Sequence, residues 1–393
     1  MGGSLNNIHN NTSFALYLHS KAIAKLQEQA STGSRVNRAS DDPTSAYQVL
    51  GLNSQKKTLE NYLKNMSNVS SILDESSVIV NSISLAITNT KASLNQILSG
   101  TYDESGRQRV AGQINDTLEH IVSLANSQHM GSYIFGGTNT DTAPYAAQRS
   151  NGEITSVTYQ GSLDQRNVEV APGVQSNAYY VGNDIFSSDN RSAPIFTGDT
   201  GAAAGSGTTS VKGNAWLTVT HDGTNYNLSI GGATVDLGDA ADLSNVAVTN
   251  ANGEVLYVDA RNITSTGTDM VTVPGTHDIF EVLISVRDLL KNEQGLSEAQ
   301  LQKCRNNLSS SLDEVKNLLV GKETSMGFKI GFIEDLKNSL ENIKYNAEDE
   351  ATLIQEADIA QIAIDLSRRE VLYQMSLSTA GRLMSMSLLD FID

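Results

Sequence analysis

An apolar residue at every seventh position from Leu52 to Leu94 constrains this chain more than any other feature of its sequence. The positions are Leu52, Leu59, Met66, Leu73, Val80, Ile87 and Leu94, and the positions three residues further on are apolar in four of seven cases. A strict heptad repeat of this length predicts a helix whose seam packs along a partner helix. We expect that helix to span about residues 44–99, roughly 80 Å at 1.5 Å per residue, which is longer than a compact enzyme core needs.

Apolar stripes with helical spacing also occur on both sides of this segment. One shorter helix is predicted at 110–124, and the first residues carry a weak stripe made of Leu5, Ile8, Thr12, Ala15, His19, Ala22 and Leu26. We expect that first helix to be poorly ordered until it meets a partner. Two helices are predicted after residue 276, and the stripe of the last consists of Ile359, Ile362, Leu366, Tyr373, Leu377, Ala380, Met384, Leu388 and Phe391. Because residues 383–392 are apolar nearly all round, we expect them to be buried in a partner or an assembly.

Glycine and proline are concentrated in the middle of the chain. Residues 131–275 hold 19 of the 31 glycines and four of the five prolines. Strands are predicted at 153–159, 166–170 and 255–259, and a hairpin at 216–230 around an Asp-Gly turn. The small-residue stretch 197–213 favours a surface loop or linker. The predicted fold class is therefore α+β: a long antiparallel coiled-coil helical bundle formed by the N- and C-terminal regions, with a β-rich outer domain inserted in the middle.

Charge and hydropathy exclude several classes of protein. Lys and Arg number 27 against 44 Asp and Glu, a net charge of −17, so the chain lacks the basic surplus of a nucleic-acid or anionic-membrane binder. It contains no apolar run long enough to span a membrane, and its first residues lack the pattern of a cleaved secretory signal. We therefore expect a soluble protein, or one exported without a cleaved signal peptide.

The reactive side chains do not form a recognisable catalytic or metal pattern. Cys304 is the single cysteine, so neither an internal disulfide nor a cysteine metal cluster can form. The six histidines include no His-Glu-x-x-His pair, and no Gly-x-Ser-x-Gly or phosphate-loop motif occurs. A calcium cluster of Asp236, Asp239 and Asp242 is an alternative to solvated loop acids, but it lacks EF-hand spacing. We predict no enzyme activity, no cofactor and no metal.

Two further segments resemble a known family. The run Gly33–Pro43, between the first helix and the long one, is similar to the turn that the bacterial flagellin superfamily has at this place, and Tyr133–Tyr145 is similar to the signature at its outer domain. Within that superfamily both are most like the hook-filament junction family, hook-associated protein 3, as is the end Ser387–Ile392. The motif residues are Arg35, Asn37, Ser40, Asp41, Asp42, Pro43, Tyr133, Phe135, Gly136, Gly137, Thr142 and Pro144. Independently of the resemblance, Ser40, Asp41 or Asp42 is expected to cap the helix that Pro43 opens.

The resemblance, which covers about 5–190 and 278–392, implies a non-enzymatic structural part that connects hook to filament. It implies export by the flagellar type III pathway to an extracellular flagellum, and terminal helices that pack coaxially on assembly. The implied partners are a ring of identical subunits, the neighbouring hook-associated junction protein, flagellin, and an export chaperone on the C-terminal helix.

The expected regions are 1–43, a helix and turn disordered in the monomer; 44–145 with 276–345, a long-helix domain; 146–275, the β-rich variable part; and 346–393, a partly disordered C-terminal helix. The predicted assembly residues are Leu5, Ile8, Ala15, Ala22, Leu26, Leu366, Tyr373, Leu377, Met384, Leu388, Leu389 and Phe391.

Three alternatives remain open. The nearest is a filament-forming flagellin, against which the Ser-Asp-Asp-Pro and Tyr-Ile-Phe-Gly-Gly motifs weigh. The others are a flagellin-like subunit with an enzymatic outer domain, such as a metalloprotease, and an adhesin that binds carbohydrate through residues 190–275.

Overall fold

The computed structural model describes residues 2–97 and 103–392, with the side chains of residues 2–9, 178 and 383–392 left undescribed. The chain divides into two compact units. The terminal unit consists of Met1–Lys64 and Leu336–Asp393, and the central unit is Asn65–Asp335. The long helices α2 (Pro43–Ile97) and α6 (Glu298–Gln355) contribute to both units.

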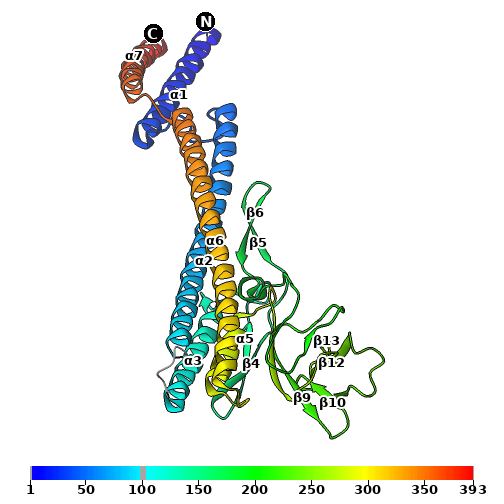
Figure 1. Ribbon diagram of the computed structural model, residues 1–393. Coiled ribbons are helices and arrows are strands. Elements are labelled where there is room, and N and C mark those ends of the chain that lie inside the picture. The colour runs from blue at the N-terminus through cyan, green and yellow to red at the C-terminus, as the bar shows by residue number, and fades with distance from the viewer. Residues whose placement is uncertain (1, 98–102, 393) are drawn as a thin grey trace. The chain divides into compact units, whose positions relative to one another are not determined.

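In the terminal unit two pairs of helices lie side by side. The first helix, α1 (Gly2–Thr32), packs along the last, α7 (Ile359–Ile392), as Figure 1 shows. The beginning of α2 runs antiparallel to the end of α6, and two ion pairs join them: Lys56 to Glu348 at 2.6 Å and Lys344 to Glu60 at 3.6 Å.

In the central unit α2 and α6 are also paired. Lys91 contacts Asp313 at 2.5 Å, and the Asn81 amide donates to Glu323 at 2.9 Å. From Leu59 to Leu94 every heptad position of α2 is buried, and Leu52 is half-buried. The predicted seam is therefore confirmed.

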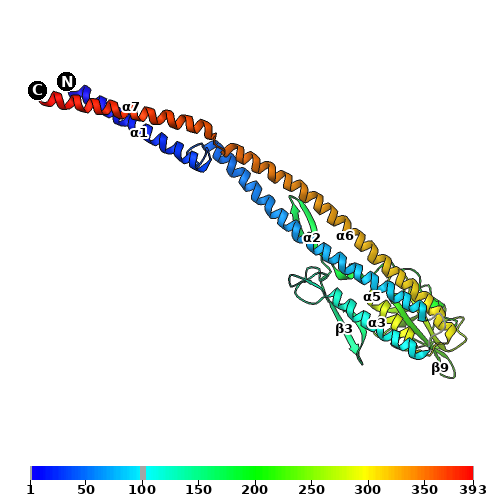
Figure 2. The same cartoon turned by 90° about the vertical axis from the view of Figure 1, so that its left-hand side faces the viewer.

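Two shorter helices complete the helical part of the central unit. Helix α3 (Glu104–Ala125) begins after Asp103, whose side chain accepts the Gly106 N–H at 2.9 Å. Helix α5 (Ile279–Lys291) packs against α3, and Figure 2 shows both lying alongside α2. The helix expected at 110–124 is thus part of α3.

Small antiparallel sheets fill the middle of the chain. Between α3 and residue 187 lie three hairpins and a short helix: β1 (Gln128–His129) with β2 (Ser132–Tyr133), β3 (Tyr145–Ser150) with β4 (Glu153–Tyr159), β5 (Arg166–Ala171) with β6 (Val174–Tyr179), and α4 (Gly182–Phe186).

Two further sheets enclose one apolar core. The five-stranded sheet has the order β11-β10-β9-β14-β7, and the three-stranded sheet has the order β12-β13-β8. Leu217, Leu228 and Val271 from the first sheet meet Val248 and Leu256 from the second. The strands are β7 (Ile195–Thr197), β8 (Ala203–Ala204), β9 (Gly213–His221), β10 (Tyr226–Ser229), β11 (Val235–Asp236), β12 (Val246–Thr249), β13 (Val255–Asp259) and β14 (Gly267–Val273).

The predicted β9–β10 hairpin forms because its turn is specified locally. The Asp222 carboxylate accepts the N–H groups of Thr224 at 2.8 Å and Asn225 at 2.9 Å, and Gly223 takes φ +102°. The stretch 197–213 is mostly irregular, as expected, yet it is part of the β core, because Val211 is buried there and Thr209 is buried too.

A two-segment neck connects these sheets to the helices. Residues 187–192 pair antiparallel with 274–278: Ser188 N–H donates to His277 O at 2.9 Å and Asn190 N–H to Gly275 O at 2.6 Å. Gly275 has φ +82°, and a Cβ there would lie 1.7 Å from the Asn190 oxygen, so the close pairing requires glycine. The Glu314 carboxylate of α6 accepts the Gly275 N–H at 3.0 and 3.1 Å. The neck is therefore fixed to the helical part.

These elements confirm the α+β class, with long terminal helices packed together and a β-rich middle. Among the described residues, no helix has both the length and the hydropathy to cross a membrane.

Candidate assembly surface

The turn before α2 is built from the acidic residues that precede Pro43. Asp42 caps the helix, because its carboxylate accepts the Ser45 N–H at 3.1 Å and the Ser45 hydroxyl at 2.7 Å. The bonds from Ser45 keep the pKa of Asp42 below its usual value. The hydrogen bond from Lys25, at 3.1 Å, does the same for Asp41. The pair is thus structural, as expected, with Asp42 as the cap.

The other motif residues of this turn differ in their contacts. The Asn37 amide donates to the Ser34 oxygen at 3.2 Å, and the Arg35 guanidinium contacts Asp42 at 3.1 Å. Ser40 is exposed.

The second motif packs in the interior of the central unit. Phe135 is fully buried with its ring centroid 4.9 Å from that of Phe186, and its oxygen accepts the Gly182 N–H at 2.9 Å. Gly137 has φ +64°, and a Cβ there would lie 2.4 Å from the Ser162 oxygen. A side chain at that position would therefore break the turn.

The remaining motif residues complete the same turn. A Cβ on Gly136 would lie 2.1 Å from the Asn139 oxygen. Three hydrogen bonds hold this turn: Tyr133 N–H to Thr140 O at 2.9 Å, the Asn139 amide to Thr142 Oγ1 at 2.8 Å and Gln160 N–H to Pro144 O at 2.7 Å. This motif therefore positions backbone in the central unit and does not present reactive groups.

The predicted assembly residues fall on the α1–α7 pair. Five of them are half-buried where these helices pack: Ala15, Ala22, Leu26, Leu366 and Tyr373. Leu377 is exposed. The side chains of Leu5, Ile8, Met384, Leu388, Leu389 and Phe391 lie outside the described residues, so their role stays a prediction.

A second apolar set, which we did not predict, is exposed on the same two helices. Phe14 is 62 % exposed and Met375 is 63 % exposed, and the set as a whole is Phe14, Tyr17, Leu18, Ile364, Val371, Leu372 and Met375. Its spacing carries a signal that could have found it, because residues 14, 17 and 18 and residues 364, 371 and 375 follow the helical period beside the first stripe. Exposed apolar side chains gathered this way are typical of a surface that binds another molecule.

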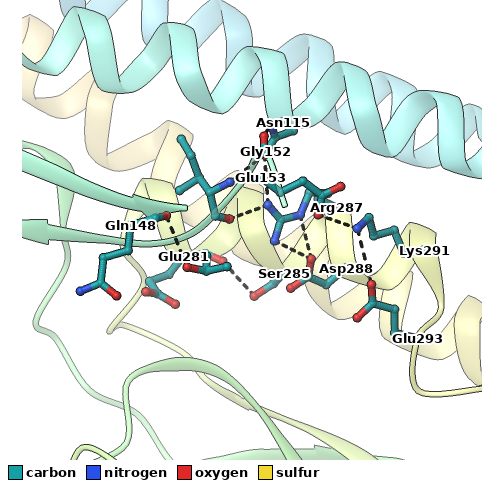
Figure 3. A network of polar contacts seen from close by, with 12 residues as sticks. Asn115, Gln148, Gly152, Glu153, Glu281, Ser285, Arg287, Asp288, Lys291 and Glu293 are labelled. Atoms are coloured by element: carbon teal, nitrogen blue, oxygen red, sulfur yellow. Dashed lines mark hydrogen bonds and ion pairs between the residues drawn. The ribbon is translucent and has the colours of Figure 1, made fainter. Parts of the chain in front are cut away.

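A buried polar cluster of the central unit has a structural role. Arg287 of α5 is 4 % exposed, and it donates to the Asn115 side chain at 3.1 Å and to the Ile154 oxygen at 2.5 Å (Figure 3). Its guanidinium also contacts Asp288 at 2.7 Å. The Asn115 oxygen accepts the Ile154 N–H at 3.1 Å as well. The cluster therefore joins α3, β4 and α5 through mutually satisfied groups.

Metal-binding and nucleophilic chemistry find no support in the part of the chain that the structure describes. No three His, Cys, Asp or Glu side chains come together there in a way that could hold a metal ion. Burial raises the pKa of the Cys304 thiol to about 11, which keeps it protonated. One feature that can contact another molecule is the exposed apolar face of the α1–α7 pair.

The chain is similar to proteins of the bacterial flagellum. Residues 4–140 match the family model of the bacterial flagellin N-terminal helical region. Flagellar hook-associated protein 3 of Escherichia coli is 30 % identical over 128 residues, which are 32 % of this chain and 40 % of that protein. The protein of the same name from Salmonella typhimurium is 31 % identical over 141 residues, 35 % of this chain and 44 % of that one. The chain thus spans less than half the length of the curated relatives it matches.

Solved structures share the fold over more of the chain. The crystal structure of FlgL from Xanthomonas campestris in space group C2 aligns with a TM-score of 0.52 and 18 % identity, covering 75 % of this chain and 98 % of that one. That of flagellar hook associated protein-3 from Legionella pneumophila has a TM-score of 0.52 and 16 % identity, covering 77 % and 98 %. At such identities the likeness concerns the fold.

Proposed function

We propose that this chain is a structural subunit that joins hook to filament in a bacterial flagellum. The observation that carries the proposal is the α1–α7 pair, which keeps large apolar side chains such as Phe14 and Met375 exposed. The similarity to hook-associated protein 3 and the fold shared with FlgL structures support the same role. The contribution of the chain is mechanical in this proposal, because the exposed apolar set on α1 and α7 is suited to contact with other protein subunits rather than with a substrate.

The terminal helices order on assembly in this proposal. Fixing the 31 residues of α1 costs on the order of 1–2 kcal/mol each, whereas burying one large apolar side chain contributes about 1.5–3 kcal/mol. The half-buried contact between α1 and α7 offsets only part of that cost, so the pair is marginally stable in the free subunit. Burial of the exposed apolar set, and of the predicted residues from Leu383 to Ile392, against neighbouring subunits supplies the remainder.

This mechanism defines the proposed partners. Copies of the chain form a ring, with the neighbouring hook-associated protein on one side and flagellin on the other. Before assembly an export chaperone covers the C-terminal helix, whose apolar stripe would otherwise promote aggregation. The subunit leaves the cell through the flagellar type III pathway and acts outside it.

The location of the protein on isolated flagella tests the proposal. Gold-labelled antibody against the chain is expected to mark one narrow band between hook and filament in the electron microscope. A strain that lacks the chain provides the control for nonspecific labelling. Flagella without label would refute the proposal.

A filament subunit is the second candidate. It is favoured by the match to the flagellar filament 30.7 kDa core protein of Treponema maltophilum, 25 % identical over 146 residues, which are 35 % of this chain and 47 % of that protein. In the same experiment a filament subunit would be labelled along the whole filament.

A further inference from the structure

A short backbone contact joins the chain at the end of α1 to the chain just before the start of α7. We call this contact the clasp. It consists of residues 33–35 and 355–357. Ser34 and Glu356 form an antiparallel bridge, the Arg35 N–H donates to Gln355 O at 2.6 Å and the Ala357 N–H donates to Gly33 O at 3.0 Å. The clasp thus joins the segment after α1 to the segment before α7.

The Arg35 side chain extends this contact to both long helices. Its guanidinium donates to Asp42 at 3.1 Å and to the Ser45 hydroxyl at 3.0 Å, at the beginning of α2. It also donates to the Ile354 oxygen at 3.2 Å, at the end of α6. Because three acceptors hold one planar group, the position of the clasp is tied to the α2–α6 pair.

The apolar stripes of α1 and α7 do not by themselves select one register. A stripe that repeats every seven residues meets its partner again after a slip of one heptad, about 10.5 Å along the helix. The connector 33–42 would reach roughly 33–36 Å if it were extended, so its length permits such a slip. A fixed contact at the entry of both helices removes that freedom.

The register of the helix pair agrees with that of the clasp. Leu26 lies seven residues before Gly33, and Asp365 lies seven residues after Asp358; both line one groove between α1 and α7. Further out, Ala15 and Ser376 are each eighteen residues from the same two points and line the next groove. An antiparallel pair requires such equal separations from Gly33, in the clasp, and Asp358, the residue that directly follows it.

We propose that the clasp sets the pairing register of the two terminal helices, with Arg35 as its positioning residue. The clasp holds the end of α1 and the start of α7 at one level, so that each apolar stripe meets the intended part of the other. A uniform register gives every subunit the same exposed apolar set. The inference concerns the purified chain and does not depend on whether the chain joins hook to filament.

Disulfide formation between introduced cysteines tests the proposal. The in-register pair is Ala22→Cys with Arg369→Cys, eleven residues before Gly33 and eleven residues after Asp358, and the slipped pair is Ala22→Cys with Ser376→Cys. The full chain is oxidised mildly with and without trimethylamine oxide, an osmolyte that favours burial. The parent with Cys304 alone is the blank, since that thiol is buried.

The clasp predicts different outcomes for the parent and its variants. In a chain with the unaltered clasp, the in-register disulfide is expected to form at least about tenfold faster than the slipped one. Cysteines more than 7 Å apart at Cα cannot be bridged, and a fixed register keeps the slipped pair apart. Arg35→Pro removes the guanidinium and the N–H donor, and should bring the two rates within about threefold of each other. Arg35→Ala and Arg35→Lys, which keep the backbone bond, should fall between, with Lys closer to the parent.

Arg38→Ala is the matched control, because Arg38 lies in the same connector and pairs with Glu28 at 3.2 Å. It should keep the parent ratio, and circular dichroism should show equal helix content in all variants. Equal ratios in the parent and in Arg35→Pro would overturn the proposal. So would a parent chain that forms neither disulfide, since its helices would then not pair in this register.

Discussion

At Arg287 a buried charge is held by three elements, and its loss should be costly. Arg287→Ala leaves Asp288 and the Ile154 oxygen without the Arg287 donor and the Asn115 oxygen with one donor fewer, which should cost about 3–5 kcal/mol of unfolding free energy. Arg149→Ala is the control, because Arg149 pairs with Glu119 on the surface and such pairs contribute about 0–1 kcal/mol. Urea unfolding followed by the fluorescence of Trp216, the single tryptophan, measures both. Equal losses would contradict the assignment of a structural clamp.

Asp278 predicts a pH dependence of stability. Its carboxylate caps α5 by accepting the Phe280 N–H at 2.7 Å, while burial raises its pKa to about 7 from an ordinary value of 3.8. The folded chain therefore binds more protons than the unfolded chain between about pH 4 and 7, and this group's contribution to stability falls as pH rises through that window. Asp278→Asn keeps an acceptor but does not titrate. Relative to the parent, its unfolding free energy should rise by on the order of 2 kcal/mol from pH 5 to pH 8.

Asp222→Asn is the control for that measurement. Backbone hydrogen bonds from Asn225 and Thr224 lower the pKa of Asp222 below its ordinary value, so it does not titrate between pH 5 and 8. Its difference from the parent should be flat over this interval. A flat difference for Asp278→Asn as well would rule out the raised pKa.

The sequence predicted some of these residue roles and not others. Asp42 before Pro43 is a local pattern, so its capping role was foreseeable. Arg287 carries no such signal, because its partners come from α3 and β4, far away in the chain. A charge within an apolar helix predicts that a partner exists, but the fold decides which one.

Within the elements, the α2–α6 seam should account for much of the stability of the helical part. Leu73 is fully buried on α2, so Leu73→Ala should lower the unfolding free energy by about 2–5 kcal/mol. Leu85→Ala on the same helix is the matched control, because Leu85 is 59 % exposed and its truncation should change stability by about 0.5 kcal/mol or less. Thermal unfolding monitored by circular dichroism compares the two. Similar effects would mean that the heptad seam is not the packed face.

Elements with local signals were predictable, and those without were not. The heptad of α2 and the Asp-Gly turn between β9 and β10 specify their structures within a few residues. The strand β8 spans two residues, and it exists because Ala203 and Ala204 pair with β13. This edge strand depends on its tertiary contact with β13, which the composition of residues 197–213 does not reveal. The composition therefore predicted an irregular segment there.

For the molecule as a whole, the apolar C-terminal end should be needed for assembly and not for folding. Leu388→Asp with Leu389→Asp places two charges on the predicted stripe, and we expect a folded chain whose cells are non-motile, because a buried unpaired charge opposes association. Leu163→Asp is the control, since Leu163 is 71 % exposed in the central unit. Motility in soft agar and the thermal unfolding of the purified chains provide the two readouts. Normal motility of the double variant would contradict the proposed assembly mechanism.

At this scale the sequence predicted that the terminal helices need partners, but not which residues would remain available to them. Ala22 and Leu366 lie on the predicted stripes and are half-buried where α1 and α7 pack. Phe14 and Val371 lie beside those stripes and stay exposed. Which apolar residues are buried and which stay exposed depends on how each helix is rotated about its axis toward the other. The periodicity of a single helix does not determine that rotation.

The neck has a consequence for how such a chain can change over evolution. Ser188 and His277 are bonded neighbours, although 88 residues separate them in the chain. A segment that starts and finishes at one point can be shortened, exchanged or replaced without moving the helices on which it is mounted. The pairing of residues 187–192 with 274–278 is therefore a natural splice point, where a new surface can be introduced while the helical part stays the same.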